Sequence, residues 1–295
     1  MKAINYQHNK KAANSMPTTR IELFCSSFSA RFGSFILPNL FCTLFYIPLF
    51  LWLFFCLSTF LLADAETVVL ASDTLWLLCI GFCICISMEG PIKCGITKLM
   101  IAWSRNDSCS RMATLLCGIK DNWKKSVLFS LVNALLFFIS FGASYYYMTG
   151  FAESQGVRFI GIVFSFLLSI LVLLMQQSIY AMIVTYEIPL SGLLKNALLL
   201  AIVEFAKGFG ILILRFLPSL LLLLSFFIFP KAISLVFLAY ILYYLLIGFS
   251  VDHFICASFS NYLMEKHINI KIPGAHVNIG MDSEYVVQLK EQSNG

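Results

Sequence analysis

The sequence predicts an all-α fold, a polytopic transmembrane helical bundle of about six spans with amphipathic cytoplasmic helices. Two observations predict it. Hydrophobic residues make up 60% of the 295 residues and charged residues only 12%, whereas a soluble domain is closer to half apolar and a quarter charged. The apolar residues also lie in long runs without charges. Because so much apolar surface cannot be covered by so few charges, hydrocarbon is the expected solvent of these runs.

Each run between charges approaches the roughly 20 apolar residues that a helix needs to cross a bilayer. The first contains Pro38 and Pro48, which predict a kink or a late helix start. The second ends at Glu89 and is the shortest. The last is expected to continue helically to Met264. The predicted spans are residues 35–62, 70–88, 126–148, 159–184, 208–229 and 232–251.

The distribution of Lys and Arg predicts the orientation. With six spans and the N-terminus inside, nearly all basic residues fall in inner segments, and the outer loops hold only Arg158 and Lys231. Lys and Arg concentrate on the cytoplasmic side of membrane proteins, so both termini are expected in the cytoplasm. The chain then divides into a disordered cytoplasmic segment 1–30, a membrane domain 31–265 and a cytoplasmic tail 266–295.

The loop between the second and third spans predicts two amphipathic helices, residues 92–104 and 110–124. In the first, apolar residues recur at helical spacing and basic residues lie elsewhere on the wheel. Such helices either lie at the headgroup boundary or pack against the cytoplasmic ends of the spans. A further short apolar helix is expected at 191–206, on the cytoplasmic side.

Arg215 is the most informative single residue, because a charge within a span costs about 2.5–3.5 kcal/mol on insertion scales. On one continuous helix, Glu204, Lys207 and Arg215 share a face. This face predicts a polar stripe toward the bundle interior, with Arg215 paired to Glu204 or Glu187. The alternative is that Arg215 snorkels to the cytoplasmic interface.

Other polar residues within the spans favour helix packing. Asn133 and Gln176 are expected to bond between helices or, alternatively, to contact a solute. The small residues Gly161, Ser165 and Ser169 form a packing seam. Asp252 and His253 are interpreted as an ordinary polar helix terminus.

No motif in the sequence predicts catalysis. There is no nucleophile elbow, no HExxH and no Walker A loop, so no catalytic residue, no cofactor and no ATPase activity are expected. Cys79, Cys83 and Cys85 have neither His nor carboxylate among them, and no metal site is expected. An intramembrane enzyme is therefore the least favoured class, and the scattered basic residues do not suggest nucleic acid.

Two stretches resemble a known family. Span two ends in SMEGPIKCGITKLMIAWSRND, and GIKDNWKKS leads into the next span. With the later LLKNALLLAI, this pattern over about residues 33–265 resembles the YesL family of uncharacterised bacterial membrane proteins. The extended N-terminus and the Cys-rich second span depart from it. The positions that carry the resemblance are Pro91, Gly95, Asn122, Trp123, Lys124 and Lys125.

The resemblance implies a bacterial plasma membrane protein whose relatives often accompany carbohydrate uptake systems. The first functional hypothesis is therefore a transport-associated component for carbohydrate uptake, with the positions of the resemblance contacting transporter subunits or anionic lipid. The second is an autonomous small-solute transporter or channel, with a polar path near Arg215, Asn133 and Gln176.

Overall fold

The structure, a computed structural model, describes residues 16–62, 71–148, 154–273, 275 and 277–281. These residues form helices and connecting turns, without a strand among them. Six of the helical segments are long and apolar enough to cross a membrane. The predicted all-α bundle with six spans is thus confirmed, and the chain is a multi-pass integral membrane protein.

The helices follow one another with short connections. They are α1 (Arg20–Arg31), η2 (Phe32–Phe35), α2 (Ile36–Leu62), α3 (Ala71–Ser104), α4 (Arg111–Met148), α5 (Gln155–Thr185), α6 (Leu190–Val203), α7 (Phe205–Ile228), η4 (Pro230–Ala232), α8 (Ile233–Tyr243), the π-turn η5 (Tyr244–Gly248), α9 (Phe249–His267) and η6 (Asn269–Lys271). As predicted, the last span continues helically past Met264 and a short helix precedes α7.

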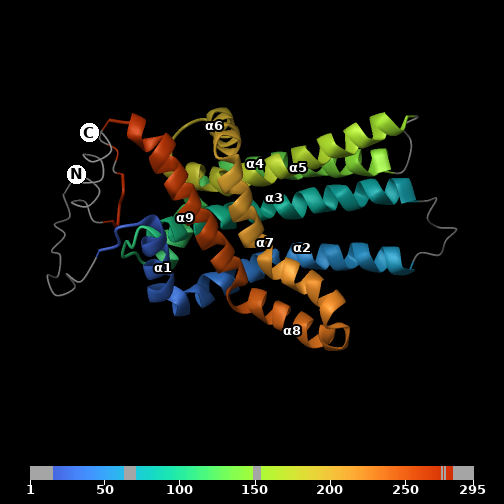
Figure 1. The fold of residues 1–295 in the computed structure, drawn as a ribbon, viewed down its shortest axis with the longest axis horizontal. Coiled ribbons are helices and arrows are strands. Elements are labelled where there is room, and N and C mark those ends of the chain that lie inside the picture. The colour runs from blue at the N-terminus through green and yellow to red at the C-terminus, as the bar shows by residue number, and fades with distance from the viewer. Residues whose placement is uncertain (1–15, 63–70, 149–153, 274, 276, 282–295) are drawn as a thin grey trace.

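The long helices form two groups (Figure 1). Helices α2 to α5 run along the long axis of the molecule, each packed against the next. Helices α7 and α8 form a hairpin that leans away from this row, and α9 crosses the row at the end that carries α1. Helix α7 contacts α5 of this row and also α9, and η5, which follows α8, contacts α2.

The packed core lies at the α1 end of the bundle. Ile92, Leu99 and Trp103 of α3 and Phe254 of α9 are almost fully buried there. Toward the opposite end, large apolar side chains such as Phe141 are exposed. In a membrane, these exposed apolar surfaces contact lipid.

Segments 92–104 and 110–124 are not separate helices, which corrects the sequence prediction. They are the ends of α3 and α4, which have 34 and 38 residues, or about 51 and 57 Å against a hydrocarbon core of about 30 Å. The apolar stripe of the first segment is buried in the core. Of the two predicted placements, that segment therefore packs against other helices.

Glycines explain why α3 continues through Pro91. A Cβ at Gly90 would lie 2.5 Å from the carbonyl oxygen of Ser126, and one at Gly95 would lie 2.7 Å from that of Leu115. The backbones of α3 and α4 therefore approach closely on both sides of the proline. This packing stabilises a helix that Pro91 alone would break.

Residues 20–30 are helical, so the prediction that 1–30 is disordered is wrong for this part, and residues 1–15 lie outside the described chain. Helix α1 begins with a capping box in which Thr19 and Glu22 bond each other's backbone N–H groups. Arg20 forms an ion pair with Glu265 of α9. Both ends of the described chain therefore lie at the same end of the bundle.

A π-turn, η5, joins α8 to α9. The side-chain amide of Asn39, on α2, donates to the carbonyl oxygens of Tyr244 at 2.8 Å and Leu245 at 2.7 Å. Its oxygen accepts from the backbone N–H of Ser250 at 3.0 Å. Asn39 is fully buried and holds the backbone where the helix changes its hydrogen-bond register.

Candidate functional site: a polar cavity in the membrane domain

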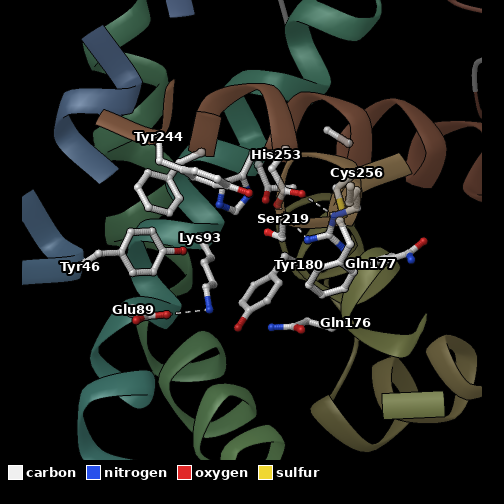
Figure 2. Close-up of a pocket in the computed structure, with 16 residues that line it drawn as sticks. Tyr46, Glu89, Lys93, Gln176, Gln177, Tyr180, Ser219, Tyr244, His253 and Cys256 are labelled. Atoms are coloured by element: carbon white, nitrogen blue, oxygen red, sulfur yellow. Dashed lines mark hydrogen bonds and ion pairs between the residues drawn. The ribbon is translucent and has the colours of Figure 1, made fainter. Parts of the chain in front are cut away.

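A cavity of about 260 Å³ lies among the helices of the bundle, and Figure 2 shows the side chains that line it. Six elements line it: α2, α3, α5, α7, η5 and α9. Its lining residues are Tyr46, Glu89, Lys93, Thr97, Gln176, Gln177, Tyr180, Arg215, Phe216, Ser219, Tyr244, Phe249, Asp252, His253, Cys256 and Ala257. At a 1.5 Å rise per residue, Glu89 lies about 27 Å from Ala71 along the roughly 51 Å of α3. The cavity is therefore just past the middle of α3, toward its α1 end.

The side chain of Arg215, on α7, contacts Asp252, on α9. Its Nε donates to Oδ1 of Asp252 at 2.6 Å and its Nη2 to Oδ2 at 2.8 Å. The predicted partners Glu204 and Glu187 are therefore wrong. Asp252 neutralises the guanidinium charge in a bidentate pair, the strongest geometry for such contacts, and holds the hairpin against α9.

Asp252 and His253 do not end a helix, which corrects their interpretation as a polar terminus. Helix α9 starts before them and continues to His267. His253 faces the cavity in Figure 2. Asp252 and His253 therefore both belong to the cavity wall.

A second ion pair lies on α3. Nζ of Lys93 is 2.8 Å from Oε2 of Glu89, one helical turn away. The side chains are 12% and 4% exposed, and the ammonium group lies 5.9 Å from the centre of the Tyr46 ring. The other oxygen of Glu89, Oε1, is buried and has no hydrogen-bond partner in the described part of the chain.

Uncharged polar groups of α5 complete the wall. The hydroxyl of Tyr180 lies 2.7 Å from Oγ of Ser130 on α4. Gln176 lines the same cavity, and its predicted contact with a solute or another helix stays a prediction. Nε2 of Gln177 donates to the carbonyl oxygen of Gly208 at 3.2 Å, which ties α5 to α7.

Glu204 and Lys207 lie apart from the cavity. Glu204 separates α6 from α7, so the expected continuous helix through Arg215 is interrupted there. Glu204 pairs with Lys266, with His267 at 2.8 Å and with Lys207 at 3.2 Å. Hydrogen bonds, first from Lys266 and then from His267 and Lys207, lower the pKa of Glu204 to about 2 although burial opposes this. The cluster stabilises the junction of α6, α7 and α9.

The remaining predicted positions have structural contacts or lie on the surface. Asn133 is buried on α4. Gly95 packs against α4 rather than facing a partner, and Pro91 lies inside α3 and is half-buried.

The positions before the third span are on α4. Asn122 donates to the carbonyl oxygen of Gly118 in its own helix at 3.1 Å. Nζ of Lys125 donates to the carbonyl oxygen of Ile188 at 3.1 Å. Trp123 is 51% exposed and Lys124 lies over its ring. Trp123 and Lys124 therefore remain available to a partner, whereas Lys125 has a structural contact.

The sequence alone does not assign Glu89 and Lys93 to a site, and it favours a helix terminus rather than a cavity for Asp252 and His253. Glu89 and Lys93 follow an apolar run, a pattern that favours the end of a span and the start of an inner segment. One signal was present, since Glu89 and Lys93 have the spacing of an ion pair on a helix.

The fold and the cavity define a class: an integral membrane protein with a cavity lined by charged residues of its helices. Comparison with protein-family models, with curated proteins and with solved structures finds no match. The functional argument therefore rests on the residues of the cavity.

Proposed function

We propose that this protein is a carrier or channel for a small polar solute, with the cavity as its solute site. The observation that supports the proposal is that two ion pairs, Glu89–Lys93 and Arg215–Asp252, line one cavity among the spans. Ionisable groups in spans are costly and commonly mark solute or ion pathways. A bundle that served only as an anchor would be more stable with apolar side chains there.

The volume of the cavity limits the solute. At about 260 Å³, it is smaller than the roughly 300–1,000 Å³ of pockets that hold drug-sized ligands. The solute is therefore of the size of a single amino acid or monosaccharide. Tyr46, Phe216 and Tyr244 add apolar surface to the wall.

The location that we propose is the plasma membrane of a bacterium, with both termini in the cytoplasm. The bias of Lys and Arg toward the inner segments supports this orientation. The contact between Arg20 and Glu265 agrees with it, because it requires the two ends of the described chain to share one side.

A role as a component beside carbohydrate transporter subunits is a second proposal. It is supported by the exposed indole of Trp123 and by Lys124 above it, and by the resemblance to the YesL family. Affinity capture from native membranes tests it. Transporter subunits should co-purify with the wild type and should not co-purify with a Trp123→Ala, Lys124→Ala variant.

Uptake into proteoliposomes tests the first proposal. Vesicles with purified protein are offered radiolabelled amino acids, monosaccharides, amines and carboxylic acids. We expect uptake of at least one class above that of protein-free vesicles. Ser219→Trp, which fills the cavity, should abolish this uptake, whereas Leu220→Trp, at the next residue and 41% exposed, should retain it.

Two outcomes would contradict the proposal. One is the absence of uptake for every solute class, and the other is equal uptake by the two Trp variants. The thermal midpoint of each purified variant is measured first, so that loss of uptake is attributed to the filled cavity only when the variant is folded.

A further inference from the structure

A cluster of positive charge lies where α7 and α9 meet, outside the cavity. Lys207 and Lys266 both contact the carboxylate of Glu204, Lys207 at 3.2 Å. The side chain of Glu204 is 8% exposed, whereas those of Lys207 and Lys266 are 54% and 44% exposed. Two accessible ammonium groups thus flank one buried carboxylate. The cluster therefore carries an excess of positive charge even if His267, which also contacts Glu204, is neutral.

The ring of Tyr262, on α9, restrains both ammonium groups. Nζ of Lys207 donates to the hydroxyl of Tyr262 at 2.8 Å. Nζ of Lys207 lies 5.2 Å from the centre of the ring, and Nζ of Lys266 lies 5.8 Å from it. A side chain whose position is already restrained loses less conformational entropy when it binds a ligand. The two lysines therefore form one preorganised site rather than two independent surface charges.

The cluster retains N–H donors for an anionic ligand. Each ammonium group has three donors. In the described part of the chain, Lys207 uses two of them, for Tyr262 and Glu204, and Lys266 uses one, for Glu204. Three of the six donors are therefore taken and three remain. The free oxygens of a phosphate diester accept such charge-assisted hydrogen bonds, and two ammonium groups that share one carboxylate are close enough to share one phosphate.

The cluster lies at the level where lipid headgroups are expected. Phe205 begins α7, one of the helices that can cross the membrane, so Lys207 is in the first turn of a span. Lys266 follows Glu265, which pairs with Arg20 of α1, so the cluster is at the α1 end of the bundle. Lipid phosphates lie at the ends of spans, beside the hydrocarbon core. The two lysines are therefore placed to meet them.

Toward the middle of the span, the face of α7 that carries Lys207 is apolar. Ile211 and Leu214 follow Lys207 by four and seven residues, the spacing of one helical face. Leu214 is exposed. Gly210, three residues after Lys207, is also exposed, and a Cβ there would meet no atom within 4 Å. This surface is open to an acyl chain that descends from a headgroup at Lys207.

We propose that Lys207 and Lys266 bind the phosphate of an anionic phospholipid whose acyl chain lies along α7 past Leu214. An anionic lipid is favoured over a zwitterionic one because its net negative charge offsets the excess positive charge of the cluster. Lipid is favoured over a soluble phosphate because a soluble ion makes no contact with the apolar face of α7. The proposal does not depend on transport, since neither lysine lines the cavity.

Native mass spectrometry of the purified full chain in detergent tests the proposal, because it resolves the ligands bound to each protein molecule. The probes are dioleoylphosphatidylglycerol, dioleoylphosphatidylcholine and glycerol 3-phosphate, which share a phosphate but differ in net charge or in acyl chains. We expect phosphatidylglycerol to bind about tenfold or more tighter than either of the others, the effect of two lysines on a net negative charge. Equal or tighter binding of phosphatidylcholine refutes the selection by charge, and equal or tighter binding of glycerol 3-phosphate refutes a lipid site.

Variants locate the lipid. Lys207→Gln combined with Lys266→Gln should weaken phosphatidylglycerol binding about tenfold or more and leave phosphatidylcholine binding unchanged, whereas a structural defect would weaken both. Lys120→Gln combined with Lys231→Gln removes the same charge from exposed residues elsewhere and should bind as the wild type. If the first variant does not fold, Lys266→Gln alone replaces it, since Lys207 then keeps its bonds to Glu204 and Tyr262. Wild-type phosphatidylglycerol affinity in the folded variant, or an equal loss in the control, overturns the proposal.

Discussion

Asn39 allows a quantitative test of how α2 supports the π-turn. Replacing it with Leu removes three hydrogen bonds, to the carbonyl oxygens of Tyr244 and Leu245 and from the N–H of Ser250. Side-chain hydrogen bonds in membrane proteins contribute about 0.6 kcal/mol on average, so the three predict a loss of about 2 kcal/mol. For a chain of this size, a loss of that order lowers the thermal midpoint by about 4–8 °C.

Asn39→Asp separates hydrogen bonding from packing. It keeps the shape of Asn but places a second oxygen against two carbonyl oxygens, so it should destabilise more than Asn39→Leu. Thermal unfolding of the detergent-solubilised variants measures both. Thr43→Val is the control, because Thr43 only bonds the carbonyl oxygen of Asn39 in its own helix. If the thermal midpoint of Asn39→Asp equals or exceeds that of Asn39→Leu, the assigned role of the amide is wrong.

Three further predictions concern other contacts. Gly90→Ala should destabilise by about 1–3 kcal/mol by pushing α3 from α4, whereas Gly142→Ala, with open space around it, should be neutral or stabilising in the same melting assay. Arg215→Gln, Asp252→Asn and their combination should give a coupling energy of about 1–3 kcal/mol in a double-mutant cycle, and additive losses would contradict the pair. The pKa of Glu204 is lowered from 4.5 to about 2, so its stabilisation is present above pH 4.5 and is lost as the pH falls toward 2. Unfolding of Glu204→Gln should therefore depend less on pH across that window than unfolding of the wild type, and parallel pH profiles would refute the assignment.

Composition and charge spacing were enough to predict the fold class, because they report directly on the solvent of each helix. Six apolar helices follow from that logic, whereas the burial of the stripe at Ile92 was one of two placements that the sequence allowed. The capping box at Thr19 and Glu22 also predicts the start of α1, against the polar composition around it, which favours disorder.

The cavity could be predicted only in part, because it depends on how helices rotate about their axes. Arg215 was singled out by its position in an apolar run, yet its partner Asp252 is distant in sequence and lies beyond the π-turn. Charges usually mark the ends of spans, so the sequence favours a boundary at Glu89. Continuation of α3 past Pro91 depends on close packing against α4, which one sequence does not reveal.

The π-turn has a geometric consequence for the cavity. A π-turn amounts to one additional residue in an α-helix, and one residue corresponds to about 100° of rotation. Removing one residue between Tyr244 and Gly248 would put α8 and α9 in the same helical phase. If α8 kept its lipid-facing orientation, Asp252 would swing about a quarter of a circle away from the guanidinium of Arg215. The added residue thus lets one continuous segment present apolar side chains to lipid in its first half and a carboxylate to the interior in its second.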